Sequence, residues 1–205
     1  MRHYRLGTEL PPRPTEPGRP ALPLRELWAR CREALDERSI AAVEALMALD
    51  RHGDGDDAGP EADLPAATID REPAARMRGR MEAAGRLAAE AGSELLVAWV
   101  AYEVALREAL AARRAAALGR PWSAPALVVA DRAAALAPMV AGVMTNACPR
   151  QRQRALDAAR LRELEQMTDG DPFSTDAVLA HVVAALVVDR WDFDDGDALP
   201  EEVWT

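Results

Sequence analysis

An acidic stretch near residue 50 has the residue types and the spacing of a calcium-binding loop. Counted from Asp50, the segment DRHGDGDDAGPE has aspartate at positions 1, 5 and 7, glycine at position 6 and glutamate at position 12. An EF-hand loop uses this spacing because oxygen ligands from these positions surround a Ca²⁺ ion, while the glycine allows a sharp turn between them. The pattern raises one functional hypothesis, a calcium-responsive regulatory protein that uses residues 50–61.

The neighbours of this loop favour a solvated acidic segment instead. Position 8 of an EF-hand loop is normally apolar, but here it is Asp57. Pro60 and Pro65 bracket the point where the exiting helix should begin. His52 at position 3 is a poor ligand for a cation that prefers oxygen. We therefore predict no metal site and interpret residues 50–73 as a flexible acidic loop.

The side chains that usually carry catalysis are scarce. His181 lies in an apolar segment with no glutamate or histidine three or four residues away, so we interpret it as a hydrogen-bonded core histidine. All 25 basic residues are arginine, which excludes a Walker A lysine and a Schiff-base lysine. No second acid with a supporting base accompanies Glu103. We predict that the protein is not an enzyme and has no catalytic residue and no cofactor.

Glu103 and Arg107 stand four residues apart in a helical pattern, and two interpretations of this pair are open. They can form a pair on the helix surface that contributes about 0.2–0.5 kcal/mol. Alternatively, Glu103 makes a buried polar contact that anchors a pair of helices.

The segment RQRQR brings Arg150, Arg152 and Arg154 together in a chain whose formal net charge is −9. This stripe is either a solvated helix face or a docking surface for an acidic protein partner. The negative total charge argues against nucleic acid as a partner. No apolar run of about 18–20 residues is present, so we expect no membrane span and a cytoplasmic location.

The composition predicts an all-α fold. Hydrophobic residues make up 49% of the chain and aromatic residues only 4%. Alanine is abundant, whereas clusters of β-branched and aromatic residues, which favour strands, are rare. We predict one elongated helical domain over residues 1–205, with an extended Pro-rich arm at 1–23 and an acidic tail at 192–205.

The spacing of apolar residues predicts the main helices. A stripe from Met77 to Ala117 predicts one long helix or a helical hairpin, and Gly92-Ser93 is its expected interruption. Residues 150–167 predict a charged, partly exposed helix. Residues 175–191 are apolar on nearly every face and predict the most buried helix. Other expected elements are a helix carrying Leu24 to Leu35, a helix capped by Asp36, one or two short helices within 121–149, and a cap at Ser174.

Four stretches, taken in order, resemble one family. They are HYRLGTELPP, WVAYEVALREALAARRAAALGR, NACPRQRQRALDAARLRELEQM and FSTDAVLAHVVAALVVDRWDF. Together they resemble a small bacterial family encoded with V-type (A/V-type) ATPase genes, which is similar to the C-subunit of V-type ATP synthases. The matching positions are Trp99, Tyr102, Glu103, Arg107, Arg114, Gly119, Arg190 and Trp191.

The resemblance implies a helical adaptor without catalytic residues of its own. The C-subunit joins the central stalk to the membrane ring of a complex that couples ATP to ion transport. The implied partners are other V-type ATPase subunits. The implied location is cytoplasmic and peripheral to the inner face of the cell membrane through the complex. The matching residues would then serve packing or docking.

Overall fold

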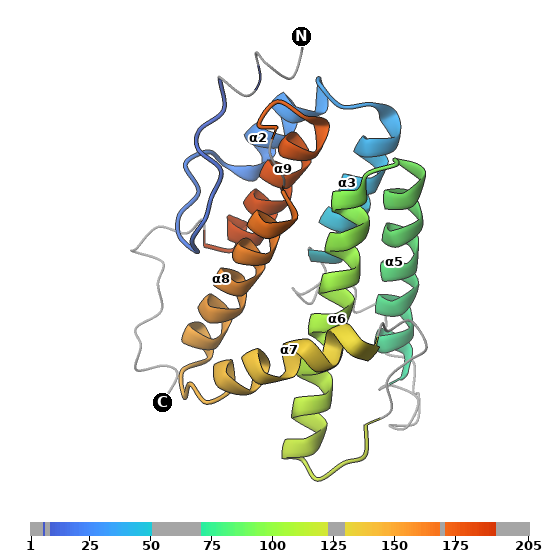
Figure 1. Ribbon diagram of the computed structural model, residues 1–205, viewed down its shortest axis with the longest axis vertical. Helices are drawn as coiled ribbons and strands as arrows, with labels where there is room; N and C mark the ends of the chain where they lie inside the picture. Colours follow the sequence, from blue (N-terminus) through green and yellow to red (C-terminus); the bar gives the residue numbers. More distant parts are fainter. Residues whose placement is uncertain (1–5, 7–8, 51–70, 123–129, 169–170, 192–205) are drawn as a thin grey trace, which may run out of the picture.

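The computed structural model describes residues 6, 9–50, 71–122, 130–168 and 171–191 (Figure 1). Over these residues the chain forms α-helices and no strand, which confirms the predicted all-α fold. The helices are α2 (Leu24–Arg32), α3 (Glu37–Asp50), α5 (Arg71–Glu90), α6 (Glu94–Ala117), α7 (Ala130–Val143), α8 (Pro149–Met167) and α9 (Thr175–Asp189).

The helices form two groups that share one core (Figure 1). In the first group α3 packs on α5, and α5 packs on α6. In the second group α9 packs between α2 and α8. Contacts of α9 with α3 and α6, and of α8 with α6, join the groups. The remaining helix, α7, crosses one end of the molecule and packs on both α6 and α8.

The long apolar stripe folds as a hairpin, because the chain turns between α5 and α6 at the predicted interruption. Gly92 has a φ of 66°, a left-handed conformation that glycine adopts without steric cost. Ser93 caps α6, since its hydroxyl accepts a hydrogen bond from the backbone N–H of Leu96. The same hydroxyl donates to Asp176 Oδ1 at 2.8 Å. The cap of α6 is therefore also tied to the first turn of α9.

Two other predicted helix starts are confirmed. The backbone N–H of Ser39 donates to Asp36 Oδ1 at 2.8 Å, immediately before α3. The hydroxyl of Ser174 accepts from the backbone N–H of Ala177 at 3.0 Å and caps α9. These side chains satisfy N–H groups that have no partner within their own helix.

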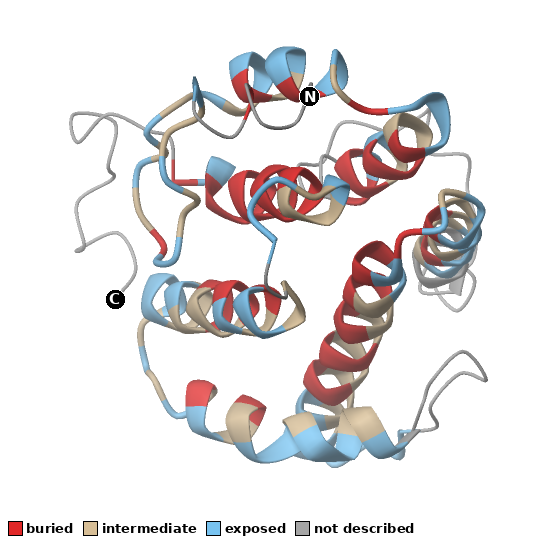
Figure 2. Ribbon diagram, turned by 45° about the horizontal axis from the view of Figure 1, so that its top comes forward, coloured by how far each residue is buried: buried red, intermediate tan, exposed pale blue. Residues whose placement is uncertain are grey.

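Helix α9 is the most deeply buried element of the described chain, as its apolar sequence predicts. Every residue from Val178 to Val188 is buried (Figure 2). A helix covered on all sides needs apolar side chains on all faces, and His181 is the exception within this segment.

Three expected boundaries are corrected. Leu6 is helical and buried, and the N–H of Leu10 donates to the carbonyl of Leu6, so the expected arm is not extended at Leu6. Leu6 and Leu10 lie four residues apart, and helical geometry lets both pack on the core. Residues 11–23 form no helix, as expected.

The predicted range of the acidic loop, 50–73, overlaps a helix at each end. Asp50 is the last residue of α3, and α5 begins at Arg71. Pro73 lies in the first turn of α5, where proline is tolerated because its missing N–H has no partner in the helix. Residues 51–70, which hold most of the calcium-loop pattern, lie outside the described residues, as do His3 and the acidic tail at 192–205.

The buried stripe of the hairpin ends about two turns earlier than the apolar pattern predicts. Leu106 and Leu110 are buried, but Arg113 and Ala117 are exposed. The last two turns of α6 extend past the core, which removes the partners that would cover them (Figure 1). Among the described residues, no helix combines the length and the apolar character needed to cross a membrane.

Candidate functional site

A buried ion pair joins α6 to α8. Arg160 Nε lies 2.6 Å from Glu103 Oε1, and Arg160 Nη2 lies 3.2 Å from Glu103 Oε2. Two parallel hydrogen bonds of this kind use the planar fork of the guanidinium against both carboxylate oxygens. Each residue is only 9% exposed. Of the two sequence interpretations of Glu103, the buried contact is therefore the one found, and its partner comes from α8.

Asp157 extends this ion pair from α8 to α9. Its side chain is fully buried, and its oxygens accept from Arg160 Nη1 at 2.9 Å and from Trp191 Nε1 at 3.1 Å. Gln153 Nε2 donates to both carboxylate oxygens at 3.0 and 3.1 Å. Arg190 Nε lies 3.8 Å from Asp157 Oδ2. The buried carboxylate is thus surrounded by donors, as its removal from water requires.

We call this set of residues the charged junction: Glu103, Gln153, Asp157, Arg160, Arg190 and Trp191. It links α6 and α8 to the end of α9, three parts of the chain that are far apart in the sequence. Glu103 also faces Arg107, whose Nε lies 3.8 Å from Glu103 Oε2, too long for a hydrogen bond.

The charges of the junction stabilise one another against the cost of burial. Burial by itself raises the pKa of Glu103, but the charge and the hydrogen bond of Arg160 outweigh it, so the pKa of Glu103 is lowered. Burial would lower the pKa of Arg160, yet Glu103 and Asp157 together raise it. Both groups are therefore charged at neutral pH.

An aromatic contact lies beside the junction. The rings of Trp99 and Tyr102 have centroids 5.7 Å apart, and the guanidinium of Arg132 lies 5.7 Å from the centre of the Tyr102 ring. Arg132 Nη2 also donates to Glu163 Oε1 of α8 at 2.9 Å. Burial, and secondly the charge of Glu103, raise the pKa of the Tyr102 hydroxyl.

The chemistry of the junction is that of a clamp between helices. A general acid or base needs a pKa near the working pH and an atom free to meet the substrate. Glu103 has a lowered pKa, and its two oxygens are held by Arg160. Asp157 is fully enclosed. These carboxylates therefore fix the relative positions of α6, α8 and α9.

The structure brings together some of the predicted residues and separates others. Trp99, Tyr102 and Glu103 lie at or beside the junction, together with Arg190 and Trp191. Arg114 and Gly119 lie at the far end of α6, where both are exposed. Gly119 has a φ of 63° and lies just past the end of the helix, where a left-handed glycine is common.

Sequence reasoning missed Asp157 and Arg160. Their positions in the sequence could have indicated their role. Spacings of four and three place four residues on one helix face: Gln153, Asp157, Arg160 and Leu164. Leu164 is buried, so the polar residues on the same face had to be buried or shielded as well. A charged pair in line with a core leucine is thus a usable sign of a buried ion network.

The predicted basic stripe on α8 is partly occupied by contacts within the chain. Arg152 donates to the backbone carbonyls of Asn146 and Ala147, just after the end of α7. The guanidinium of Arg154 lies 5.9 Å from the centre of the Trp191 ring. Arg150 is exposed. A docking role for these arginines stays a prediction.

His181 is a core residue, but its expected hydrogen bond is not found at Nε2. The residue is 8% exposed, and its buried Nε2 atom has no hydrogen-bond partner in the described structure. Burial, and secondly the charge of Arg13, lower the pKa of His181 to about 4. The imidazole is therefore neutral at physiological pH.

No group of three or more histidine, cysteine, aspartate or glutamate residues could hold a metal ion within the described ranges. Both cysteines are free thiols, and burial raises the pKa of Cys31 to about 12. Cys31 is therefore an unreactive core residue.

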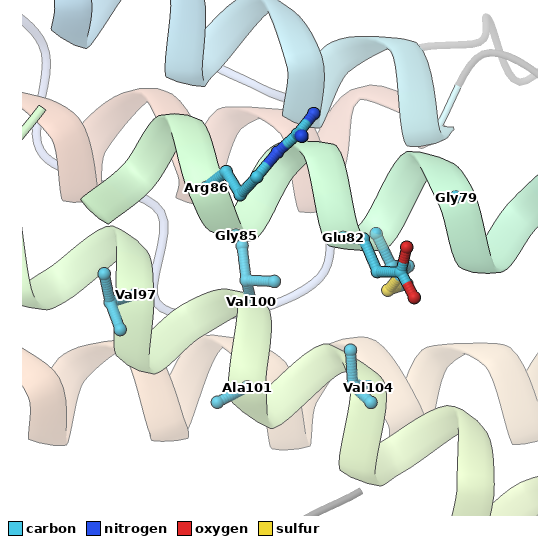
Figure 3. Close-up of a pocket in the computed structure, with 9 residues that line it drawn as sticks. Gly79, Glu82, Gly85, Arg86, Val97, Val100, Ala101 and Val104 are labelled. Carbon is cyan, nitrogen blue, oxygen red and sulfur yellow. The ribbon is translucent and has the colours of Figure 1, made fainter. Parts of the chain in front are cut away.

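A groove of about 540 Å³ runs between α5 and α6 (Figure 3). Small and apolar side chains line most of it, and its charged members are Glu82 and Arg86. Val97 on its edge is 42% exposed. The groove could accept an apolar surface, but its walls bring no nucleophile and base together.

Comparison of the chain with protein-family models, with curated proteins and with solved structures gives no match.

Proposed function

We propose that the protein is a non-enzymatic subunit or accessory of a bacterial V-type ATPase, similar to the C-subunit and acting as an adaptor between the stalk and the membrane ring. The proposal starts from the resemblance of four sequence stretches to the family encoded with V-type ATPase genes. On this proposal the protein contacts other ATPase subunits through the faces of its helices.

The observation that carries the proposal is the charged junction. Three of the four resembling stretches contribute to it: Glu103 from the first long stretch, Asp157 and Arg160 from the second, and Trp191 from the last. Stretches that were selected only for their likeness to a family therefore meet in one cluster. Such a cluster suits an adaptor, because a rigid arrangement of helices presents a constant surface to its partners.

The basic stripe on α8 is the proposed contact surface. Arg150 and Arg154 are exposed, and they lie on the same helix that the junction holds in place. Charged residues at the edge of an interface mainly steer association and select the partner. An acidic surface on another protein of the complex is the complement that this stripe requires.

Co-purification tests the proposal. A tagged copy of the full chain is expressed in cells that also express the V-type ATPase, and the recovered proteins are identified by mass spectrometry. We expect ATPase subunits to be recovered in proportion to the tagged protein. Recovery of the protein without any V-type ATPase component would overturn the proposal.

Charge reversal on α8 tests the docking surface within the same experiment. The double variant Arg150→Glu/Arg154→Glu is compared with Arg25→Glu/Arg38→Glu, which changes the same charge on α2 and α3 at exposed positions. We expect only the α8 variant to reduce recovery of ATPase subunits, by about 10-fold or more. Equal recovery of ATPase subunits with both variants would show that the docking surface is not on α8.

A further inference from the structure

The end of α6 differs in charge from the rest of the molecule. Residues 109–130 contain three arginines and no acidic residue, in a chain with 34 acidic and 25 basic residues. All three arginines precede Trp122. The described part of this segment therefore carries a local positive charge on a protein whose net charge is −9.

The same end of α6 exposes large apolar side chains. Leu118 is 69% exposed and Trp122 is 46% exposed, and both belong to the few large apolar side chains that are exposed among the described residues. Gly119 has a left-handed backbone just past the end of α6, and Trp122 follows three residues later. We call Arg113, Arg114, Leu118, Arg120 and Trp122 the α6 tip.

The α6 tip projects from the body of the molecule. In Figure 1, α6 continues beyond the point where α7 crosses it. Arg113, Arg114 and Arg120 are all exposed. Within the described ranges, no carboxylate oxygen lies within ion-pair distance of these three guanidiniums. The arginines of the junction, by contrast, face Glu103 and Asp157.

We infer that the α6 tip binds an anionic lipid surface, with Trp122 and Leu118 at the level of the headgroups and the arginines on the lipid phosphates and carboxylates. Tryptophan is favoured at the membrane–water interface because its ring is amphipathic. Arginine at this position can place its apolar stem against lipid while its guanidinium reaches the anionic groups. Stable peripheral binding requires two signals, and the tip has both apolar side chains and positive charge.

Two observations favour lipid over a protein partner at this surface. The tip lies at the end of α6 that continues past α7, and such a projecting helix end suits insertion into a headgroup layer better than the matched packing of two protein surfaces. Its charges are also of one sign, whereas the edge of a typical protein interface is mixed. The net charge of −9 does not prevent binding, because salt screens charges beyond about 8 Å at physiological ionic strength. Glu103 and Arg114 are about 16 Å apart along α6, from the helical rise per residue.

Flotation with lipid vesicles tests the inference on the full chain. The protein is mixed, at about 0.1 M salt, with vesicles of phosphatidylcholine containing about 30 mol% phosphatidylserine, and in parallel with phosphatidylcholine alone. We expect the protein to float with the anionic vesicles and to be released as the salt concentration rises. Failure to bind the anionic vesicles would overturn the inference.

Matched variants locate the binding surface. Arg113→Gln/Arg114→Gln/Arg120→Gln removes the charges of the tip, and Arg25→Gln/Arg38→Gln/Arg162→Gln removes the same charge at exposed positions on α2, α3 and α8. The tip variant should bind about 100-fold more weakly, since each arginine near an anionic surface contributes about a five-fold factor. Equal weakening by both variants would overturn the inference, because total charge would then explain the binding.

Two single substitutions test the apolar part. Leu118→Ser should weaken vesicle binding by about 10-fold, and Phe173→Ser, at a position that is 37% exposed, should leave it unchanged. Thermal unfolding confirms that each variant is folded. If the wild-type protein does not bind vesicles, and the tip variant recovers fewer ATPase subunits in co-purification than the wild type, the tip is a protein interface and the lipid inference is wrong. Vesicles contain no ATPase, so the outcome is independent of the proposed function.

Discussion

The two halves of α6 place similar residues in opposite surroundings. In the first half Glu103 is buried and bonded to Arg160, and the neighbouring Trp99 and Tyr102 are covered by other helices. In the second half Arg113 and Arg114 are exposed, and the helix continues past its neighbours.

The difference shows that burial determines the role of a charged side chain in this protein. A buried charge must be paired, because its desolvation is not otherwise compensated. An exposed charge needs no partner within the chain and is available to an external one. The junction therefore serves stability and the arrangement of the helices, whereas the α6 tip is suited to contact with another surface. Four predictions test this division, in order of decreasing effect.

The largest effect is expected from Arg160→Met, which removes the shared cation of the junction. Glu103 and Asp157 would then remain buried with fewer donors, and we expect the free energy of unfolding to fall by about 3–5 kcal/mol. Urea unfolding monitored by circular dichroism measures this change. Arg113→Met is the matched control and should change stability by less than about 0.5 kcal/mol. Equal losses in both variants would remove the distinction between the two halves.

His181 provides the second test, because it is a buried polar group whose Nε2 lacks the partners that the junction residues have. Its pKa falls from 6.5 to about 4 in the folded protein, so the unfolded chain binds the proton more readily. Stability should therefore decrease as the pH falls through this window, by about 2 kcal/mol between pH 7 and pH 5.

The variant His181→Leu should remove most of that pH dependence. It also replaces a buried group without a partner at Nε2 by an apolar side chain of similar size, which should raise stability at neutral pH. Urea unfolding at the two pH values measures both effects. The lowered pKa of Glu103 acts in a separate window, because its contribution is lost only as the pH falls below the unfolded value of 4.5. A pH dependence that persists in His181→Leu would assign it to another group.

The third prediction concerns the buried start of α6. Ser93→Ala removes two hydrogen bonds of the Ser93 hydroxyl: the one that caps α6 at the N–H of Leu96 and the one to Asp176. We expect a loss of about 1–2 kcal/mol in unfolding free energy, at the upper end for a helix cap. Thr145→Ala, at an exposed hydroxyl beyond the end of α7, is the control and should cost less. A loss no larger than that of the control would mean that the link between α6 and α9 contributes little.

The smallest effect on stability is expected from the α6 tip. The triple variant Arg113→Gln/Arg114→Gln/Arg120→Gln should change the free energy of unfolding by no more than about 0.5 kcal/mol, since its side chains are exposed. Thermal and urea unfolding measure this. A loss comparable to that of Arg160→Met would show that the tip arginines have structural partners and would weaken the case for an external one.

Much of the fold was predictable from the sequence because local rules govern it. The all-α class follows from the composition. The hairpin turn follows from Gly92-Ser93, and the caps at Asp36 and Ser174 follow from side chains that satisfy helix N–H groups. The burial of α9 follows from apolar residues on every face. Each of these features depends on residues close together in the chain, which is why the pattern alone was sufficient.

Only the tertiary structure decided which charges are paired. Glu103 and Arg160 are 57 residues apart in the sequence, and nothing local to either residue identifies the other as its partner. The same is true of the missing hydrogen bond at His181 and of the point where α6 leaves the core. The apolar stripe continues to Ala117, but burial ends near Leu110, and the end of α6 continues past its crossing with α7 (Figure 1). Amphipathic spacing predicts which face of a helix can be buried, and the lengths and crossings of its neighbours determine how much of that face is covered.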